Sequence, residues 1–387
     1  MLVRVDNTSK REKDIFLIMK AWVLQDIGDI QYTEVATPQP GENEALISVR
    51  AAGICGSDIP RIYRDGAHKM PLIPGHEFSG QVVAIGHGVS EKWLQKRVGI
   101  YPLIPCRSCI ACRKGQYEMC RQYGYLGSRQ DGGFAEYVRV PIDNLIELPD
   151  NVTYEQAAML EPMTVAIHAM RRVSITPADK IVVCGLGTIG LLLIMVLLEC
   201  GIENVLVIGN KDSQREKILA LGLSEDRFCD SRRENVGEWV SSHTDEAGAD
   251  VFFECVGKNE TVSQAIRLTA PGGRICMEGN PYTDMFLDKQ TYWKILRNQL
   301  HVTGTWNSSF FGHDNETGHR ESDWSVALQL LQRERIAPEQ LISHRYDLAD
   351  LEEGLHVMRD KEEDYLKVIT FLPSCKVELN DNRLPKE

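Results

Sequence analysis

Short apolar segments of strand length recur along the first part of the chain. Residues 45–49, 81–85 and 134–140 are apolar runs separated by clusters of Gly, Pro, Asn and Asp. Runs of this length between turn-forming residues are typical of β-strands. The pattern therefore predicts an irregular, mostly β domain between about residues 21 and 140.

The hydrophobic pattern changes from about residue 180 onward. Apolar runs now alternate with helix-like segments; the runs are IVVC (181–184), NVLVI (204–208), RFCD (227–230), DVFFECV (250–256), GRICMEG (273–279) and LHVTG (300–304). Alternation of strands and helices is typical of a parallel sheet with crossover helices. This part of the chain is predicted to be an α/β domain built on a doubly wound parallel sheet.

The C-terminal part has fewer elements. An amphipathic helix is predicted around residues 325–332, after a polar stretch that follows Trp306. A second helix is predicted to start at Asp350, with Glu353 as its capping-box partner. The apolar run 366–372 predicts a final strand, and the polar residues 373–387 are expected to fray.

Charge and cysteine usage narrow the class of protein. The 387 residues carry 43 basic and 55 acidic side chains, a net charge of −12, which argues against nucleic acid or an anionic membrane as partner. The uncharged segment 181–198 is interrupted by three glycines and Thr188, so a strand, turn and helix are expected there instead of a membrane span. Eleven cysteines and an N-terminus without a signal-peptide pattern favour a cytoplasmic protein.

Four cysteines form the strongest local motif. Their spacing is C-x2-C-x2-C-x7-C, at Cys106, Cys109, Cys112 and Cys120. Four thiolates at such spacing can surround one tetrahedral Zn²⁺ with no open position, which predicts a structural zinc. The alternatives are unrelated buried cysteines or an iron–sulfur cluster; the bacterial ferredoxin spacing differs, because its fourth cysteine follows after three residues and precedes a proline.

A glycine loop follows the predicted strand 181–184 and opens a helix. Its residues are Gly185, Gly187, Thr188, Ile189 and Gly190, in a G-x-G-x-x-G pattern. Glycines at these positions permit a tight turn and close approach of a pyrophosphate to backbone N–H groups. The loop predicts a dinucleotide site, and Gly257, after the predicted strand 250–256, is expected to contact the same cofactor.

The end of the next strand bears on the choice of cofactor. An NAD enzyme is expected to offer Asp or Glu there, whereas this chain has Gly209, Asn210 and Lys211. The missing carboxylate leaves room for a 2′-phosphate, which the amide of Asn210 and the cation of Lys211 could bind. NADP is therefore expected to be preferred and NAD to be possible. The alternative is that Lys211 is a solvated loop residue and Asp212 supplies the carboxylate.

A third set of residues has the chemistry of a catalytic zinc site. Cys55, His76 and Glu161 offer a thiolate, an imidazole and a carboxylate, which leaves a fourth position for water or substrate. Glu77 is adjacent to His76, so on a strand the two side chains face opposite ways, and Glu77 is either an outer-shell residue or a ligand that exchanges with water. The wide separations leave open that some of these residues are structural.

These motifs together resemble the zinc-containing medium-chain dehydrogenase/reductase family. The resemblance covers about residues 19–373 and includes the segment from Gly75 to Val89, the glycine loop and the four-cysteine lobe. Within that family, residues 55–80, 127–137 and 161–169 resemble the polyol-phosphate branch near the sorbitol dehydrogenases. Glu161 stands where many alcohol dehydrogenases have a second cysteine ligand.

The resemblance implies a fold and a domain order. A GroES-like, β-rich catalytic domain with the structural zinc lobe is expected over residues 19–170, a Rossmann domain over 171–309, and a return to the catalytic domain over 310–387. Residues 1–18 are expected to be a disordered extension, with Met19 as an alternative start. The active site is expected in the cleft, and the protein is expected to be a homodimer or homotetramer.

The resemblance also implies a reaction. Zinc-assisted hydride transfer to the nicotinamide is expected, with Ser57 moving the proton of the substrate hydroxyl; the alternative for Ser57 is a turn residue that caps its own loop. The expected substrate is a polyol phosphate resembling galactitol 1-phosphate. Its phosphate needs cations, and the preferred pair, Arg61 and Arg129, is taken from a set that also includes Arg64, His68 and Lys69.

Other functions fit parts of the same pattern. An unphosphorylated polyol such as sorbitol, a diol or an amino alcohol is an alternative substrate. A non-catalytic nucleotide-binding protein is an alternative of another class, and the presence of Cys55, Ser57, His76 and Glu161 together argues against it.

Overall fold

The computed structural model describes residues 18–281, 283–312 and 321–372, and the chain divides into two compact units. The first unit comprises Met1–Cys106, Gln122–Met159 and Ile342–Glu387, and the second comprises Arg107–Arg121 and Leu160–Leu341. The contacts thus divide the chain near residues 159 and 341, whereas the expected domain boundaries lie near 170 and 309. The expected N-terminal extension and the C-terminal residues 373–387 lie outside the described residues, except for Ile18, which begins the first strand.

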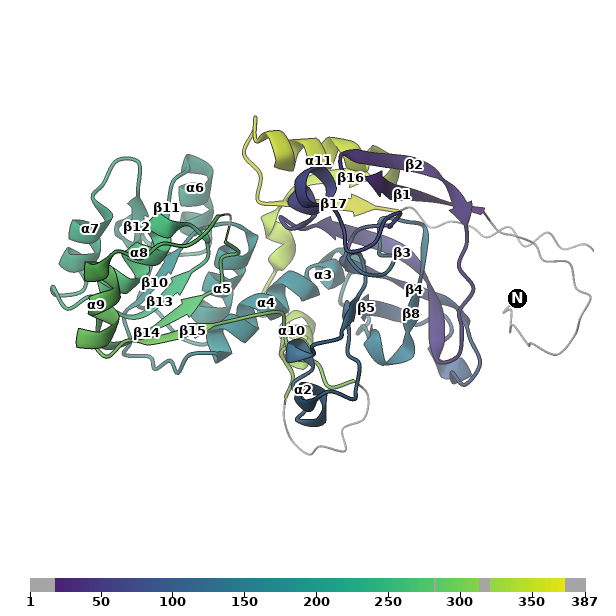
Figure 1. Ribbon diagram of the computed structural model, residues 1–387, viewed down its shortest axis with the longest axis horizontal. Helices are drawn as coiled ribbons and strands as arrows, with labels where there is room; N and C mark the ends of the chain where they lie inside the picture. Colours follow the sequence, from purple (N-terminus) through teal and green to yellow (C-terminus); the bar gives the residue numbers. More distant parts are fainter. Residues whose placement is uncertain (1–17, 282, 313–320, 373–387) are drawn as a thin grey trace, which may run out of the picture. The chain divides into compact units, whose positions relative to one another are not determined.

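The first unit is mostly β (Figure 1). Its strands are β1 (Ile18–Asp26), β2 (Asp29–Ala36), β3 (Glu44–Ile54), β4 (Glu77–Ile85), β5 (Arg97–Ile100), β6 (Leu103–Ile104), β7 (Gly124–Tyr125), β8 (Tyr137–Pro141), β9 (Leu145–Glu147), β16 (Ile342–Asp347) and β17 (Lys367–Phe371). Its helices are the short α1 (Asp58–Pro60) and α3 (Tyr154–Ala158), and α11 (Leu351–Asp360). The prediction of an irregular β-rich domain is confirmed.

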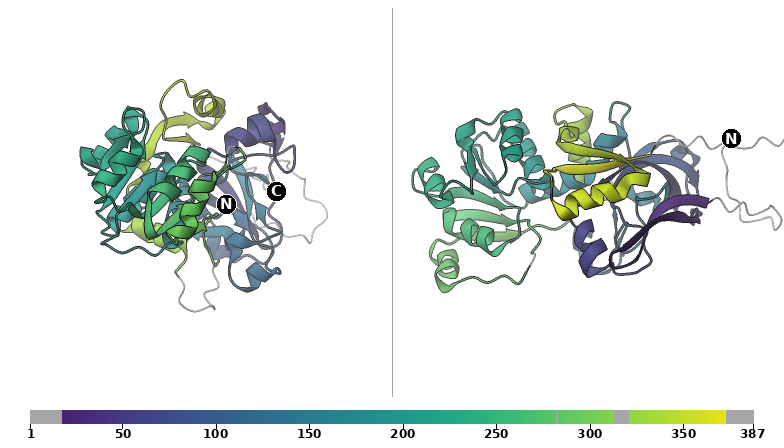
Figure 2. Two further views of the ribbon diagram at one scale, coloured as in Figure 1. Left: turned by 60° about the vertical axis from the view of Figure 1, so that its left-hand side comes forward. Right: turned by 90° about the horizontal axis from the view of Figure 1, so that it is seen from above.

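One sheet of seven strands organises this unit. The order is β16-β17-β3-β4-β5-β9, and β8 also pairs with β3. All pairs are antiparallel except β16 with β17, and α11 lies along these two strands (Figure 2). Most residues of β3 and much of β4 are buried, and Ile47, Phe78 and Val82 belong to the core. Successive side chains of a strand point to opposite faces, so burial of successive residues means that both faces are covered, which explains the uninterrupted apolar runs of the sequence.

Two local expectations differ from the structure. Asp350 does stand at the N-cap of α11, but its side chain makes no capping hydrogen bond, so the predicted capping box with Glu353 is wrong. A 3-10 turn, Leu348–Asp350, enters the helix and gives Asp350 a φ of −100° and a ψ of 17°, away from the extended backbone on which a capping side chain depends. The run 134–140 becomes a strand only from Tyr137.

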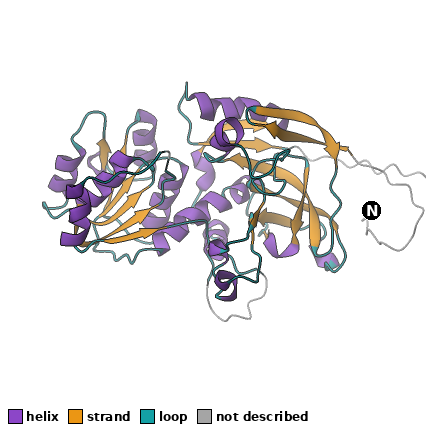
Figure 3. Cartoon of the chain, viewed as in Figure 1, coloured by secondary structure: helices purple, strands orange, loops and turns teal. Residues whose placement is uncertain are grey.

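The second unit contains the parallel sheet (Figure 3). Its strands are β10 (Ile181–Cys184), β11 (Val205–Gly209), β12 (Phe228–Asp230), β13 (Ala249–Glu254), β14 (Thr269–Met277) and β15 (His301–Gly304). Its helices are α2 (Ile110–Arg113), α4 (Leu160–Arg171), α5 (Thr188–Glu199), α6 (Asp212–Ala220), α7 (Val236–His243), α8 (Asn259–Leu268), α9 (Lys289–Arg297) and α10 (Asp323–Gln332).

The strand order in this sheet is β12-β11-β10-β13-β14-β15, and every pair is parallel. Counted along the chain, this is the order 3-2-1-4-5-6 of a doubly wound dinucleotide-binding fold. Buried residues such as Val182, Leu206 and Phe252 form its core. The prediction of a doubly wound parallel sheet is confirmed. No helix within the described ranges is long and apolar enough to cross a membrane, and residues 181–198 form β10 and α5 as expected.

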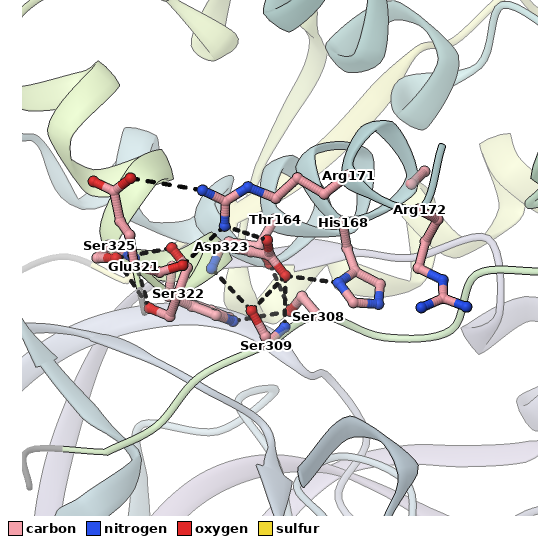
Figure 4. Close-up of polar contacts among 12 residues, drawn as sticks. Thr164, His168, Arg171, Arg172, Ser308, Ser309, Glu321, Ser322, Asp323 and Ser325 are labelled. Carbon is pink, nitrogen blue, oxygen red and sulfur yellow. Dashed lines mark hydrogen bonds and ion pairs between the residues drawn. The ribbon is translucent and has the colours of Figure 1, made fainter. Parts of the chain in front are cut away.

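A buried carboxylate connects α4, α10 and the segment after β15 (Figure 4). Asp323 is 1% exposed and accepts hydrogen bonds from Arg171 Nη1 (2.9 Å) and from the backbone N–H and hydroxyl of Ser309 (2.7 and 2.8 Å). His168 Nδ1 lies 2.8 Å from the same carboxylate. His168 and Arg171 are therefore part of a polar network that connects α4 to α10.

We expect Asp323→Ala to lower the free energy of unfolding by about 3 kcal/mol, because it leaves buried donors without their acceptor. Urea unfolding followed by circular dichroism measures the change. Glu321→Ala is the matched control, since Glu321 is exposed and approaches the same Arg171 at 3.6 Å; its expected effect is below about 0.5 kcal/mol. Equal losses in the two variants would contradict the role given to Asp323.

Candidate active site

The end of β3 and the start of β4 meet at one end of the seven-stranded sheet. Cys55 directly follows β3, and His76 directly precedes β4, its antiparallel neighbour. Because antiparallel strands run in opposite directions, the end of one lies beside the start of the next. Ligand atoms of Cys55, His76 and Glu77 consequently lie within 4.8 Å of one another, close enough to share a metal ion.

Asp58 lies next to the His76 ring. Its buried carboxylate lies 3.5 Å from His76 Nδ1, accepts the Cys55 backbone N–H (3.0 Å), and pairs with Arg61. Burial alone would raise the pKa of Asp58, but His76 and Arg61 keep that pKa below its usual value. Burial would lower the pKa of His76, whereas Asp58 and Cys55 raise that pKa well above normal. A carboxylate behind a metal-binding imidazole fixes the ring orientation, a role that sequence analysis did not assign to Asp58.

Glu77 is paired with a lysine that sequence analysis missed. Lys367, at the start of β17, forms a buried ion pair with Glu77 and donates to the Ile54 carbonyl (3.0 Å). Gly53 lies between them in the sheet: a Cβ there would stand 2.5 Å from Glu77 Oε2 and 2.8 Å from Lys367 Cε. The only sequence signal was a lysine at the start of an apolar run, which alone indicates nothing about its partner.

Ser57 faces the thiol of Cys55. Its hydroxyl lies 3.3 Å from Cys55 Sγ, and Arg61 Nη2 lies 3.5 Å from the Ser57 oxygen. Ser57 makes no side-chain cap to the short helix α1. The hydroxyl is therefore directed toward the group of ligand atoms, as a proton-transferring residue requires.

Arg61 and Arg129 both act on His68. Partial desolvation, and then the positive charges of Arg129 and Arg61, lower the pKa of His68. Arg129 stacks over the Tyr123 ring, with its Cζ 4.5 Å from the centroid, and its buried Nε has no hydrogen-bond partner among the described residues. An orphaned guanidinium donor next to other cations is suited to an anion. Arg64, by contrast, is exposed and pairs with Asp65 (2.8 Å).

Glu161 lies in the second unit, in the first turn of α4. Its side chain is buried, and its carbonyl accepts the Thr164 hydroxyl (2.7 Å), which in turn contacts Ser308 (2.9 Å). The network of Figure 4 thus fixes the start of the helix that presents this carboxylate.

The four-cysteine lobe fits a tetrahedral zinc. All four Sγ atoms lie within 4.8 Å of one another, and Cys109 Sγ lies 3.5 Å from Cys112 Sγ and 3.9 Å from Cys120 Sγ. A disulfide requires about 2.05 Å, whereas four thiolates at about 2.3 Å from one zinc are separated by roughly 3.8 Å. The helix α2 and the turn Tyr117–Met119 place these residues.

The glycine loop fits a pyrophosphate. Gly187 caps the N-terminus of α5 without a side chain, and a Cβ there would meet nothing within 4 Å, so the N–H groups of the first turn remain accessible. A Cβ on Gly190 would stand 2.0 Å from the Gly185 carbonyl, so only glycine permits the loop to close onto the helix. Thr188 and Ile189 are the first residues of α5.

The end of β11 has more cations than the sequence motif indicated. The Gly209 carbonyl accepts the N–H (2.9 Å) and hydroxyl (3.0 Å) of Ser231, which follows β12 and brings Arg232 and Arg233 to this edge. Asn210 N–H donates to Gln214 (2.9 Å), and Lys211 is the N-cap of α6. Asp212, the alternative source of a ribose-binding carboxylate, is paired with Arg232 (2.7 Å).

Two carboxyl groups lie at the ends of β13 and β14. Glu254 Oε1 accepts the N–H groups of Val256 (3.0 Å) and Gly257 (2.9 Å), which shapes the turn after β13. The Cys255 thiol donates to Glu278 Oε2 (3.1 Å). Burial, together with the charge of Glu254, raises the pKa of Glu278 to about 8, against the hydrogen bond from Cys255. Cys255 thus contacts an acid at the carboxyl edge of the parallel sheet.

Glu278→Gln tests this assignment. The pKa of Glu278 is about 8 in the folded chain, against an ordinary value of 4.5. Between pH 4.5 and 8 the carboxyl group ionises in the unfolded state but stays protonated in the folded state, so the free energy of unfolding falls as the pH rises through this range. We expect the variant to match the native protein at pH 4.5 and to gain up to about 5 kcal/mol in free energy of unfolding by pH 8, without further gain above it. Urea unfolding from pH 4.5 to 8 measures the free energy of unfolding of both proteins. A difference between them that does not change with pH would contradict the raised pKa of Glu278.

Comparisons with known proteins agree with this geometry. Residues 41–150 match the alcohol dehydrogenase GroES-like domain, and residues 188–333 match the zinc-binding dehydrogenase model. Galactitol 1-phosphate 5-dehydrogenase of Escherichia coli K12 is 33% identical over 332 residues, 84% of this chain and 92% of that protein. Sorbitol dehydrogenase of Halalkalibacterium halodurans is 31% identical over 341 residues, 87% of this chain and 94% of the relative.

A solved structure extends the similarity to the whole fold. A putative zinc-binding dehydrogenase from Sinorhizobium meliloti 1021, bound to NADP, superposes with a TM-score of 0.82 at 27% identity and covers 92% of this chain and all of its own. The β-rich unit, the 3-2-1-4-5-6 parallel sheet, the cysteine lobe and the sequence matches all lead to the same assignment. The chain belongs to the zinc-containing medium-chain dehydrogenase family and is a zinc-dependent alcohol or polyol dehydrogenase.

Proposed function

We propose that this dehydrogenase interconverts a polyol phosphate, resembling galactitol 1-phosphate, and the corresponding ketose phosphate with NADP as the preferred cofactor. The observation that carries this proposal is the buried Nε donor of Arg129, which has no hydrogen-bond partner among the described residues and whose charge acts on His68 together with that of Arg61. Similarity to galactitol 1-phosphate 5-dehydrogenase supports the same substrate class.

The proposed catalytic ligands are Cys55, His76 and Glu161. Bound zinc supplies a Lewis acid that favours ionisation of a substrate hydroxyl, and the nicotinamide supplies the hydride acceptor. Glu77 remains in our proposal an outer carboxylate, because Lys367 already neutralises it. Asp58 orients His76 and accepts the Cys55 N–H, which keeps the loop that carries the thiolate in place.

Ser57 is the proposed path for the substrate proton. A hydroxyl can accept a proton while it donates its own, so Ser57 Oγ can pass a proton between substrate and solvent without a net change of charge. Arg61 lies 3.5 Å from that oxygen and disfavours a positively charged serine, which speeds the onward transfer.

Arg129 is the proposed main phosphate residue. Tyr123 and the half-buried position of Arg129 restrict its guanidinium before any ligand binds, so little conformational entropy is lost on binding. Arg61 shares its charge with Asp58 and therefore contributes less to the binding of a dianion.

The cofactor proposal depends on the end of β11. Gly209, Asn210 and Lys211 leave out the carboxylate that would repel a 2′-phosphate. Arg232 and Arg233 pair with both Asp212 and Asp230, so these two carboxylates already have cationic partners beside the proposed phosphate site. The similarity to a structure bound to NADP supports the same choice.

The alternative is an unphosphorylated polyol such as sorbitol. Similarity to sorbitol dehydrogenase favours it, and the family chemistry is the same for both substrates. A cytoplasmic location and a homodimer or homotetramer stay predictions from the cysteine usage and the family resemblance.

Initial rates with galactitol 1-phosphate, galactitol and sorbitol, each with NADP⁺ and NAD⁺, test the function. We expect kcat/KM to be highest for the phosphate ester with NADP⁺. Arg129→Gln should raise KM for galactitol 1-phosphate about tenfold or more, because a charge-assisted hydrogen bond contributes roughly 1.5–3 kcal/mol. Arg61→Gln combined with Arg129→Gln should raise it further.

The paired substitution Arg64→Gln with Lys69→Gln is the matched control, since it removes two exposed cations from the same region. Its KM for the phosphate ester should stay within about twofold of the native value. Preference for a free polyol with NAD⁺ in the native protein would contradict both the phosphate and the cofactor proposals and favour the sorbitol-like alternative.

Ser57→Ala should lower kcat about a hundredfold, the usual scale of a lost proton-transfer group, and leave the zinc content unchanged. Steady-state rates and metal analysis of the purified protein measure the two quantities. Ser57→Thr keeps a hydroxyl and should retain most of the activity. Loss of zinc in Ser57→Ala would indicate that Ser57 supports Cys55 instead.

A further inference from the structure

Glu278 lies at the carboxyl edge of the parallel sheet, next to the residues that form the dinucleotide loop. It directly follows β14, and its N–H and that of Gly279 both donate to the Glu254 carbonyl at the end of β13 (2.9 Å each). A Cβ on Gly185 would stand 3.0 Å from the backbone of Cys255, whose thiol contacts Glu278. One residue, Cys255, therefore separates Glu278 from the glycine loop.

The strand order indicates which half of a dinucleotide lies at this position. The glycine loop after β10 and the ribose-recognising end of β11 belong to the first half of the sheet. A dinucleotide crosses the sheet at the point where the strand order reverses, so its second nucleotide lies over the ends of the second half, β13 to β15. Figure 1 shows β13 and β14 on the other side of β10 from β11. With the adenosine at β11, the nicotinamide half is therefore the one that reaches the ends of β13 and β14.

Among the described residues, the groups that act on Glu278 are the Cys255 thiol and the Glu254 carboxyl group. The charge of Glu278 acts on Cys276, and so does that of Arg172. Glu278 Oε1 and Glu254 Oε2 are shielded from solvent and have no hydrogen-bond partner within the described part of the chain. Glu77, a buried glutamate at the start of β4, differs because it has Lys367 as its counterion. At neutral pH Glu278 is consequently held mainly in its protonated form.

An oxidised nicotinamide ring carries one positive charge, and the reduced ring carries none. We propose that Glu278 is the counter-charge of the oxidised nicotinamide: binding of NADP⁺ or NAD⁺ displaces the carboxyl proton to solvent, and binding of the reduced cofactor does not. The inference deepens the proposed function and rests on its nicotinamide site. Charge and protons balance in this step: the protonated acid and the cationic cofactor give a carboxylate–cation pair and one proton released to solvent.

The pairing predicts how affinity changes with pH. Below the pKa of Glu278 in the complex the acid is protonated with and without cofactor, and above its pKa in the free protein it is ionised in both states. Affinity for the oxidised cofactor therefore rises with pH between these limits, tenfold for each unit by which binding lowers the pKa. Affinity for the reduced cofactor is unaffected by this group.

The experiment compares zinc-loaded native protein, Glu278→Gln and Glu278→Asp in weak buffer with a pH indicator. On mixing with saturating NADP⁺ at pH 7.5, native protein should release about half a proton more per site than Glu278→Gln, for a pKa that falls by about one unit from about 8. Any protons released at the zinc sites are released equally by native protein and Glu278→Gln, so they cancel when the two proteins are compared. Glu278→Asp retains an acid and should retain the release.

Dissociation constants for NADP⁺ and NADPH from pH 6 to 9.5, by fluorescence titration, give a second measurement. Native affinity for NADP⁺ should rise about tenfold more than that of Glu278→Gln, and the NADPH profiles of the two proteins should coincide. Glu246→Gln, which removes an exposed carboxylate before β13, should behave as native protein.

Equal proton release and parallel NADP⁺ profiles in native protein and Glu278→Gln would overturn the inference while leaving the cofactor site intact. A difference that is equally large with NADPH would also overturn it, since it would show a structural acid without selectivity for the charged ring. Failure of both cofactor forms to bind native protein would overturn the nicotinamide site itself and the inference with it.

Discussion

The antiparallel pairing of β17 with β3 is the constraint on which the candidate metal centre depends. It brings a strand near residue 370 beside one near residue 50, so that Lys367 reaches Glu77 across Gly53. Without that cation Glu77 would be a buried charge next to the thiolate of Cys55, which is costly in a medium of low dielectric constant. The first unit thus needs its late strand for electrostatic reasons as well as for packing.

Buried acids in this chain have different partners, and the differences match their roles. Asp58 is shared between His76 and Arg61, Glu77 has Lys367, and Asp323 has His168 and Arg171. Each of these carboxylates fixes the geometry of its neighbours, and the partners of Asp58 and Asp323 hold the pKa of those two groups below its usual value. Glu278 has a thiol and another carboxyl beside it, which is the environment of an acid that changes its protonation when a cation arrives.

The two units divide the chemistry between them. Strand ends of the antiparallel sheet supply Cys55, His76 and the basic residues near Ser57, whereas the carboxyl edge of the parallel sheet supplies the glycine loop, Gly209 and the turn at Gly257. Both arrangements use the same physical fact: side chains and backbone groups just beyond a strand are exposed to ligands yet held by a rigid sheet.

The sequence by itself determined the features that depend on local spacing. Four cysteines within fifteen residues, a glycine loop between a strand and a helix, and alternating strands and helices each depend on neighbours along the chain, and the predicted sheet, loop and cysteine lobe follow from them. The capping box at Asp350 shows the limit of even local patterns, since a preceding 3-10 turn changed the backbone there.

Only the tertiary structure decided which distant charges meet. Lys367 and Glu77 are 290 residues apart, Arg129 and Arg61 both act on His68, and Cys255 contacts Glu278 from the end of the neighbouring strand. The physical reason is that a salt bridge or a buried acid depends on strand pairing and register, and a sheet can join segments at any separation in the sequence. Residue type shows what a side chain is able to do, and the fold determines its partner.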